Sequence, residues 1–287
     1  MRVLVTGGNG QLGSALLDLL STRTADVALG VDLPDIDITA PDSVGEVLAQ
    51  FAPDVVINCA AWTAVDAAEE HEADALKVNG DGPRVLAEAC KVAGAWLVQI
   101  STDYVFAGDA NTPYAEDARP DPKTAYGRTK LAGEIAVQEV LPGAHYLVRT
   151  AWLYGLQGNN FVKTMLGLES VRDNVSVVDD QRGQPTYAGD LAKQILLLLD
   201  ARPPAGTFHA TNSGATTWFE LTRAIFENIG ADPQRVLATD SASFVRPAPR
   251  PAYSVLGQDK WESVGLTPMR EWRAALTAAF ADGITSP

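Results

Sequence analysis

The chain of 287 residues is poor in the side chains that build disulfide frameworks and metal sites. It has only two cysteines, Cys59 and Cys90, which are too few and too far apart for either purpose, so both thiols are predicted to be reduced and buried. Its three histidines, His71, His145 and His209, are scattered without a spacing typical of metal ligands. A catalytic metal is therefore not expected.

The sequence also lacks long apolar runs. Two of the longest, Val3–Val5 and Ile195–Leu199, are far shorter than the roughly 20 residues that a membrane-spanning helix needs. The first residues break into glycine after one short apolar run, and no small-residue cleavage site follows, so we expect a strand there rather than a signal peptide. The sequence predicts a cytoplasmic protein without a membrane partner.

Positive charge is scarce as well. The 22 lysines and arginines stand against 36 aspartates and glutamates, which gives a formal net charge of −14. Such a field repels polyanions, so nucleic acid is a poor partner. Hydrophobic residues make up 46% of the chain and charged residues 20%, as in ordinary globular proteins, and the length fits one or two domains.

Short apolar runs alternate with helix-like segments in the first half of the chain. Strands are predicted at Val3–Thr6, Val27–Val31, Val55–Asn58, Trp96–Ser101 and Tyr146–Arg149. Helices are predicted over Leu12–Leu20, Asp42–Phe51, Ala73–Ala93 and Tyr126–Glu139. Strands that are short and apolar throughout are typical of a parallel sheet covered on both faces. The fold class is therefore α/β, with a Rossmann-like, doubly wound parallel sheet that binds ligands beyond the carboxyl ends of its strands.

The pattern changes after about residue 154. Mixed pieces follow, with helices at Phe161–Leu168, Ala188–Leu199 and Trp218–Ile229 and strands at Val175–Val178 and Gly206–Ala210. Residues 1–154 are predicted to form a dinucleotide-binding domain to which segments near 184–210 return, and residues 155–287 mainly a smaller mixed α/β lobe. Arg246–Pro251 contains three prolines and is predicted to be a loop over the surface or over a ligand.

Three glycines, Gly7, Gly10 and Gly13, lie between the first predicted strand and the first predicted helix. Glycine at this spacing allows a tight turn, a close approach of the backbone to a pyrophosphate and close packing of helix on strand, while the helix N-terminus faces the anion. A bare glycine-rich turn is the alternative interpretation. The strand–turn–helix context favours a dinucleotide site.

Acidic and small residues further along the chain extend the predicted dinucleotide site. Asp32 closes the second predicted strand, nineteen residues after Gly13, where a carboxylate accepts hydrogen bonds from the adenine ribose. It would repel a 2′-phosphate, so charge favours NADH over NADPH. Asp37 and Ile38, later in the same loop, border the adenine or are simply loop residues, and the segment 58–63 passes the cofactor.

A phenol and an ammonium lie one helical turn apart at Tyr126 and Lys130. A nearby positive charge lowers the pKa of a phenol from about 10, so that it can exchange a proton with a carbonyl oxygen. Such a pair is also common on exposed helix faces. The catalytic interpretation gains weight because Ser101, Thr102 and Asp103 end a predicted strand at the edge of the sheet where ligands bind.

The glycine pattern, Ser101–Asp103 and the pair of Tyr126 and Lys130 together resemble the extended short-chain dehydrogenase/reductase superfamily. Six spaced strings narrow the resemblance: STDYVF (101–106), AYGRTKLAGE (125–134), RTAWLYG (149–155), GNNFVKTM (158–165), DQRGQPT (180–186) and TTW (216–218). In these strings the chain is similar to dTDP-4-dehydrorhamnose reductases over nearly its whole length.

The resemblance implies reduction of the 4-keto group of dTDP-4-dehydro-L-rhamnose with NADPH or NADH. Tyr126 would donate the proton, Lys130 would hold the nicotinamide ribose, and Thr102 would bind the reacting oxygen. Asp103 and Trp152 would contact the substrate. The predicted cofactor-binding residues, which also include Tyr126 and Lys130, are Gly7, Gly10, Gln11, Leu12, Gly13, Asp32, Asp37, Ile38, Ala61, Trp62 and Thr63.

Five polar side chains of the lobe are available for a nucleotide diphosphate, namely Asn159, Asn160, Lys163, Arg182 and Arg250. Some members of the resembled family dimerise through magnesium held by glutamates. One of these glutamates lies just after the glycine motif, where this chain has Ala15, so a monomer or weak homodimer without metal is expected. Two other functions stay open: a different nucleotide-sugar reductase or epimerase, and a non-catalytic nucleotide-binding regulatory subunit.

Overall fold

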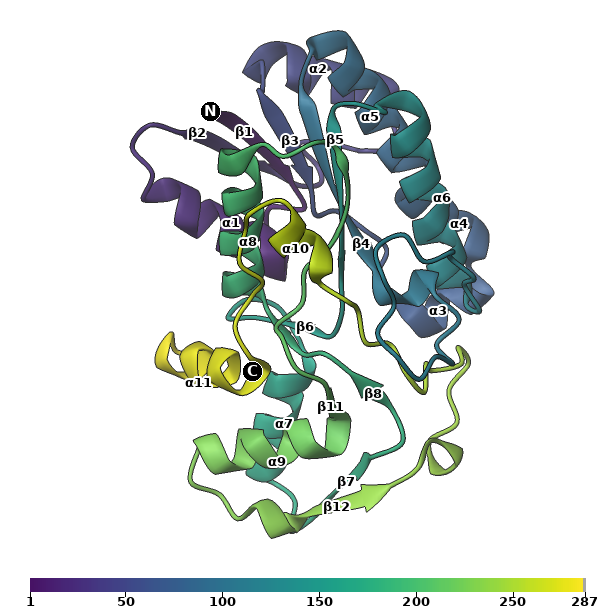
Figure 1. Cartoon of the computed structure of the whole chain (residues 1–287), viewed down its shortest axis with the longest axis vertical. Coiled ribbons are helices and arrows are strands. Elements are labelled where there is room, and N and C mark those ends of the chain that lie inside the picture. Colours follow the sequence, from purple (N-terminus) through teal and green to yellow (C-terminus); the bar gives the residue numbers. More distant parts are fainter. Residues whose placement is uncertain (286–287) are drawn as a thin grey trace.

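A computed structural model describes residues 1–285 of the chain. Its centre is a six-stranded sheet with the strand order β10-β5-β4-β3-β1-β2, and all its neighbouring strands are parallel (Figure 1). The strands are β1 (Arg2–Thr6), β2 (Val27–Val31), β3 (Val55–Asn58), β4 (Trp96–Thr102), β5 (His145–Thr150) and β10 (Gly206–His209). The predicted Rossmann-like parallel sheet is confirmed.

Helices cover both faces of this sheet (Figure 1). On one face, α1 (Gln11–Ser21) and α8 (Ala188–Ala201) contribute leucines and isoleucines to one core. On the other, α2 (Pro41–Phe51), α5 (Gly82–Ala93) and α6 (Ala125–Val140) bury their apolar sides against the same strands. Because both faces are covered, consecutive apolar residues in the middle of the inner strands are buried, such as Val3, Leu4 and Val5 of β1 and Val55, Val56 and Ile57 of β3, which explains why the sequence shows runs rather than alternation.

The predicted helix over Ala73–Ala93 is confirmed as a continuous helical segment, but it is not one regular α-helix. Short helices α3 (Val65–Glu70) and α4 (Glu72–Leu76) lead into a π-helical turn, η1 (Lys77–Asp81), and only then into α5. Pro83 has no N–H to donate to the carbonyl of Asn79 four residues earlier, so the regular helical pattern cannot continue through it. Gly133 of α6 packs against that carbonyl, where a Cβ would overlap it.

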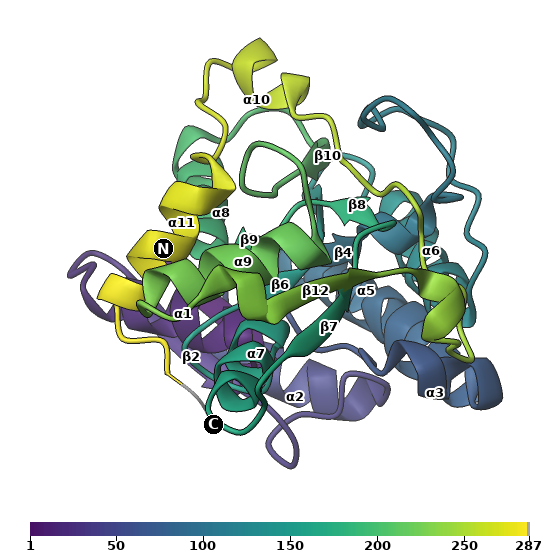
Figure 2. The ribbon, with the colours of Figure 1, turned by 90° about the horizontal axis from the view of Figure 1, so that it is seen from below.

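The second half of the chain forms a smaller lobe below the carboxyl edge of the sheet (Figures 1 and 2). Its core lies between α7 (Phe161–Glu169), α9 (Trp218–Asn228) and α11 (Trp272–Ala281), and between the parallel strands β7 (Val175–Val178) and β12 (Val236–Thr239). The remaining elements are short: η2 (Asp103–Val105), β6 (Leu153–Tyr154), β8 (Arg182–Gly183), β9 (Thr186–Tyr187), β11 (Thr216–Thr217), η3 (Pro233–Arg235), η4 (Ser241–Ser243) and α10 (Asp259–Ser263).

Two segments of the second half lie with the sheet, since β10 pairs with β5 and α8 packs beside α1. The functional division at residue 154 nevertheless stays a prediction. The proline-rich segment Arg246–Pro251 contains neither helix nor strand, as the sequence predicted. Within residues 1–285, none of the helices is long and apolar enough to cross a membrane.

Candidate active site

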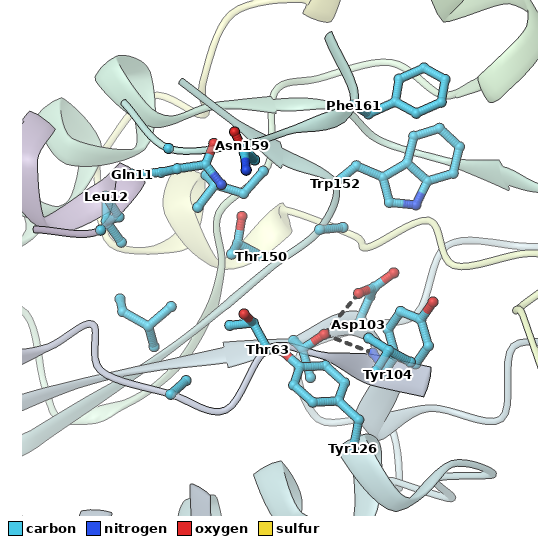
Figure 3. Close-up of a pocket in the computed structure, with 18 of the residues that line it drawn as sticks. Gln11, Leu12, Thr63, Asp103, Tyr104, Tyr126, Thr150, Trp152, Asn159 and Phe161 are labelled. Atoms are coloured by element: carbon cyan, nitrogen blue, oxygen red, sulfur yellow. Dashed lines mark hydrogen bonds between the residues drawn. The ribbon is translucent and has the colours of Figure 1, made fainter. Parts of the chain in front are cut away.

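A cavity of about 1250 Å³ lies at the carboxyl edge of the sheet, and the lobe forms its opposite wall (Figure 3). Residues that follow β1, β2, β3, β4 and β5 line one side of it, and residues of α7, β7 and the start of α9 line the other. This is the edge at which ligands bind in open parallel sheets. The polar side chains of the cavity therefore form the candidate active site.

The glycine turn lies at one end of this cavity. Gly7 has φ +67°, and a Cβ there would come within 2.6 Å of the backbone nitrogen of Ala60. A Cβ on Gly13 would overlap the carbonyl oxygen of Gly7. The helix α1 starts at Gln11 without a side-chain cap, so its first N–H groups are available at the cavity. The turn is therefore a backbone cradle of the kind that suits the pyrophosphate of a dinucleotide.

Asp32 lies beside this cradle. Its carboxylate accepts hydrogen bonds from the backbone N–H groups of Leu33 (3.0 Å) and Asn9 (3.3 Å), which fix its position at the cavity wall. Asp37 and Ile38 also line the cavity, although the Asp37 carboxylate already accepts from the N–H and the hydroxyl of Thr39. This end of the cavity carries negative charge from two carboxylates.

The residues after β3 differ in whether their side chains line the cavity. Ala61 and Thr63 line the cavity, but the Trp62 side chain is not among the described lining residues and lies beside the His71 ring, with ring centroids 6.2 Å apart. The backbone of Trp62 is held from behind, because its N–H donates to the Asn79 side chain (2.9 Å) and its carbonyl accepts from it (3.0 Å). The sequence analysis did not single out Asn79, since nothing in the sequence marks the π-helical turn that presents it.

The Tyr126 phenol and the Lys130 ammonium both lie in the cavity on α6. Burial raises the pKa of Tyr126 to about 12, and the Asp103 charge adds to this, while a hydrogen bond with Thr102 opposes it. The predicted lowering of the phenol pKa by Lys130 is therefore wrong for this structure, because burial dominates. The phenol is neutral at pH 7 and carries a proton that it can donate.

Burial lowers the pKa of Lys130 to about 8, against the opposing charge of Glu134. Its Nζ donates to the carbonyl oxygen of Ile100 (2.7 Å) at the end of β4. The ammonium form therefore predominates at pH 7 but is lost within about one pH unit above it. Such a group can hold hydroxyls in the cavity as a hydrogen-bond donor.

Thr102 is the last residue of β4 and Asp103 follows it, and both line the cavity. Figure 3 shows Asp103 near Tyr126. The Thr102 hydroxyl donates to the Asp103 carboxylate (3.0 Å) and accepts from the N–H of Tyr104 (3.2 Å). Burial raises the pKa of Asp103 to about 6, although hydrogen bonds from Ser254 and Thr102 oppose the shift. Its second carboxylate oxygen, Oδ2, has no partner among the described residues. An unpartnered buried oxygen at a cavity is available to a ligand hydroxyl.

Trp152 lies across the cavity from Tyr126 (Figure 3). It has φ +46°, which is unusual for a side chain of this size, and its ring stacks on Trp218 with centroids 3.6 Å apart. The Trp218 indole N–H donates to the side-chain oxygen of Gln181 (3.1 Å). A Cβ on Gly183 would come within 2.5 Å of the Trp152 ring. The Trp152 indole is therefore held in place by a second indole and by the backbone of Gly183.

The five polar groups predicted for a diphosphate divide into two sets. Asn159 and Arg250 line the cavity, whereas Asn160, Lys163 and Arg182 are not among its described lining residues. Asn160 caps α7 by accepting from the N–H of Lys163, whose ammonium donates to the carbonyl of Leu156. Helix capping explains these two polar residues without any ligand.

The proline-rich loop supplies two cations to the cavity, Arg246 and Arg250, of which the sequence analysis named only Arg250. Arg250 pairs with Asp66 of α3 (2.8 Å), and the N–H of Ala248 donates to the same carboxylate (3.3 Å). This loop therefore lies over the cavity and is tied to the sheet side of it.

Among residues 1–285, no group of three His, Cys, Asp or Glu side chains is placed to hold a metal ion. Cys90 is buried, as expected, whereas the residue Cys59 is partly exposed and lines the cavity, although burial still raises the pKa of its thiol to about 12. Cys59 follows β3 and lines the same cavity as the glycine turn.

The family model described as the RmlD substrate binding domain matches residues 1–284. The chain belongs to the RmlD family. Known relatives extend over nearly the whole of this RmlD-family chain. It is 54% identical over 284 residues to a dTDP-4-dehydrorhamnose reductase of Streptomyces griseus, covering 97% of this chain and 93% of that protein. It is 48% identical over 279 residues to a dTDP-4-keto-6-deoxy-D-glucose reductase of Streptomyces niveus, covering 97% and 96%.

A solved structure agrees with this family assignment. The dTDP-4-dehydrorhamnose reductase of Bacillus anthracis in complex with NADP matches with a TM-score of 0.94 and 40% identity, over 98% of this chain and 99% of that one. The sequence analysis identified the same family from its six strings. It missed Asn79, Gln181, Gly183 and Arg246, of which Gln181 and Gly183 lie inside one of the quoted strings.

Proposed function

We propose that this chain reduces the 4-keto group of dTDP-4-dehydro-L-rhamnose to dTDP-L-rhamnose with NAD(P)H. One observation supports this chemistry: a neutral, partly buried Tyr126 phenol shares a cavity with a glycine cradle suited to a dinucleotide. The relatives support the choice of substrate, since proteins with 46% to 54% identity are named dTDP-4-dehydrorhamnose reductases. Neither the cradle nor the phenol alone would distinguish this reaction from others on the same fold.

The residues present fit a nicotinamide dinucleotide. The start of α1, with Gly10, Gln11 and Leu12, would hold the pyrophosphate, and Asp32 the adenine ribose. When bound, the cofactor supplies a hydride. Lys130 would hold the nicotinamide ribose, since it lies one helical turn from Tyr126 on α6 and lines the same cavity. Because two carboxylates lie at the ribose end, charge favours NADH, although the Bacillus anthracis relative was solved with NADP.

The chemical step needs a proton on the carbonyl oxygen. Tyr126 would donate it, because its raised pKa keeps the phenol protonated at neutral pH. To hydrogen-bond the same oxygen, the Thr102 hydroxyl would turn its proton from the Asp103 carboxylate to that oxygen. The free oxygen of Asp103 would accept from a sugar hydroxyl. The Trp152 indole would form the opposite wall against the sugar ring.

The substrate diphosphate needs positive charge in a chain with a net charge of −14. Among the described residues that line the cavity, the lysines and arginines are Lys130, Arg246 and Arg250. Lys130 is directed to the Ile100 carbonyl, so the two arginines of the proline-rich loop would meet the diphosphate. Residues 1–154, with α8 and β10, would then bind the dinucleotide, and residues 155–287 would mainly bind the nucleotide sugar.

A second candidate is reduction of a related dTDP-4-keto-6-deoxy sugar, because the Streptomyces niveus relative with that name is 48% identical. We further propose that the protein is cytoplasmic, where its nucleotide substrate and cofactor are found, and acts as a monomer or weak homodimer. An epimerase would return its hydride and consume no net cofactor, and a regulatory subunit would turn over neither sugar.

The test is the loss of nicotinamide absorbance with purified protein and NADH or NADPH, for each of the two keto sugars. Turnover of dTDP-4-dehydro-L-rhamnose that disappears in Tyr126→Phe supports the proposal. Faster turnover of the other keto sugar would support the second candidate. Bound cofactor without net oxidation of either would overturn the reductase assignment.

A further inference from the structure

Lys130 holds a positive charge in a place that disfavours it. The side chain is buried, and its described hydrogen bond goes to the Ile100 carbonyl, which also accepts from the side-chain amide of Gln99 (2.9 Å). A backbone carbonyl carries no net charge that could balance an ammonium, and burial of an unbalanced charge is costly. The proposed role of Lys130 therefore requires a compensating group nearby.

Glu134 lies one helical turn beyond Lys130 on α6, on the same helix face. It is also buried, with 2% of its side chain exposed. Arg149 of β5 holds its carboxylate with two hydrogen bonds, from Nε to Oε1 (2.8 Å) and from Nη2 to Oε2 (2.7 Å). Bidentate pairing of this kind fixes the position of a carboxylate as well as its charge.

The far side of Arg149 is closed by neutral groups. Its Nη1 approaches the Glu116 carbonyl and His209 Nε2, both at 3.4 Å, and the guanidinium lies over the Phe106 ring. Burial, reinforced by the Arg149 charge, lowers the pKa of His209 to about 3, so His209 is uncharged. The buried set thus contains two cations, Lys130 and Arg149, and one anion, Glu134.

A purely structural role is the simpler explanation of this ion pair. Buried ion pairs are often no more stabilising than apolar side chains of similar volume, so stability alone explains Glu134 poorly. Its position on α6, one helical turn from Lys130, gives its charge a second effect. The Glu134 charge opposes the loss of the Lys130 proton, and without it Lys130 would share the interior with Arg149 alone.

We propose that Glu134, fixed by Arg149, is a positioning residue that keeps Lys130 an ammonium at the cavity. The proposal rests on the proposed function, in which that ammonium holds the nicotinamide ribose beside Tyr126. Arg149 has a separate part in it: by taking both oxygens of Glu134, it prevents the carboxylate from pairing directly with Lys130 and drawing it out of the cavity.

The other titratable groups around Lys130 do not replace Glu134. A charge on Cys59, after β3, would also raise the Lys130 pKa, but burial raises the pKa of the Cys59 thiol itself to about 12, so it is neutral where Lys130 titrates. Tyr126, one turn earlier on α6, is a neutral phenol for the same reason. Asp103, after β4, acts on the Tyr126 phenol and is not one of the charges that shift Lys130. Glu134 is therefore the ionised partner that can be removed selectively.

The test measures the pH dependence of NADH affinity and of kcat in Glu134→Gln. Loss of the carboxylate should move the alkaline limb of both profiles about one to two pH units lower, because a close opposite charge shifts a pKa by that much. Glu134→Asp keeps the charge and should keep the limb near its original pH. Glu139→Gln, which neutralises an exposed carboxylate of the same helix, is the matched control and should not move it.

An unmoved alkaline limb in folded Glu134→Gln would overturn the proposal and leave Glu134 with a structural role. If that variant does not fold, the double variant Glu134→Gln/Arg149→Met replaces the pair by uncharged groups. The alkaline limb of this double variant should move to lower pH by less than one unit, because loss of the nearby Glu134 charge is partly offset by loss of the more distant Arg149 charge. An unmoved limb in the double variant would also overturn the proposal. NADH affinity needs no sugar, so the result stands even if the proposed keto substrate is not turned over.

Discussion

The cofactor half and the substrate half of the cavity are built from different parts of the fold. The cofactor half lies at the ends of β1 to β4, whose hydrogen-bonded register fixes Gly7, Asp32 and Thr102 relative to one another. The substrate half is assembled from Trp152, Trp218 and a proline-rich loop, held by stacking and by one ion pair. Strand ends are positioned by the sheet, whereas loops are positioned only by what their side chains touch.

This difference assigns separate kinetic effects to the two halves. Changes at the strand ends and on α6 should act on the chemical step and on cofactor binding, since those groups surround the proposed proton donor. Changes in the lobe should act mainly on KM for the nucleotide sugar, because the lobe makes contacts that are the same in the ground state and the transition state. A lobe variant that lowers only kcat, or a strand-end variant that raises only KM for the nucleotide sugar, would contradict this division.

The largest effect is expected for Tyr126→Phe. Loss of a positioned proton donor should lower kcat by at least ~10²-fold, while NADH affinity stays near that of the unchanged protein. Steady-state kinetics and NADH fluorescence measure the two quantities. Near-normal turnover would mean that the phenol is not the proton donor. The chemical step could then no longer be assigned to the cofactor half.

The pH dependence should be the next largest effect. The pKa of Lys130 is lowered to about 8 by burial, so its ammonium is lost as pH rises through that value, and kcat should fall by roughly tenfold for each pH unit above it. The phenol of Tyr126, with its pKa near 12, keeps its proton over this range. Lys130→Arg should lose the alkaline limb whatever its residual activity, because a guanidinium stays charged. If the alkaline limb persists in Lys130→Arg, the fall in kcat at high pH is caused by the titration of another group.

Gly183→Ala tests the substrate half. The added Cβ would come within 2.5 Å of the Trp152 ring and push the indole from its stack on Trp218. Overpacking of this size costs about 1–3 kcal/mol, so KM for the sugar should rise roughly tenfold with little change in kcat. Gly143→Ala is the control, since a Cβ there meets no atom within 4 Å. A fall in kcat with unchanged KM would place Trp152 in the chemical step.

The same difference explains what could be predicted from the sequence. Gly7, Gly13 and Asp32 were recognisable because strand ends meet at one sheet edge, so their spacing along the chain implies their meeting in space. The stack of Trp152 on Trp218 joins residues far apart in the chain, and no spacing predicts it. Trp62 was predicted to line the cavity together with its neighbours, but its backbone is held by Asn79 of the π-helical turn and its ring lies beside His71.

The phenol illustrates a second limit. The spacing of Tyr126 and Lys130 was predicted correctly as one helical turn, yet the direction of the Tyr126 pKa shift was wrong. Spacing indicates which charges are near, but not how deeply the pair is buried, and desolvation outweighs a single neighbouring charge here. Burial of the site depends on the lobe and on the loop after η4, which the sequence places only coarsely.

The smallest effect, and the one that sharpens the cofactor half, is expected for Asp32→Ala. The carboxylate is held by the N–H groups of Leu33 and Asn9, and no lysine or arginine of the described cavity lining comes from the segment around it. Removing its charge should raise the affinity for NADPH relative to NADH by a few-fold, because repulsion of a 2′-phosphate is relieved while a ribose hydrogen bond is lost. The ratio of the two dissociation constants measures this without substrate. Equal losses for both cofactors would mean that the adenine ribose is recognised elsewhere, and Asp37, whose carboxylate already binds Thr39, would be the next residue to replace.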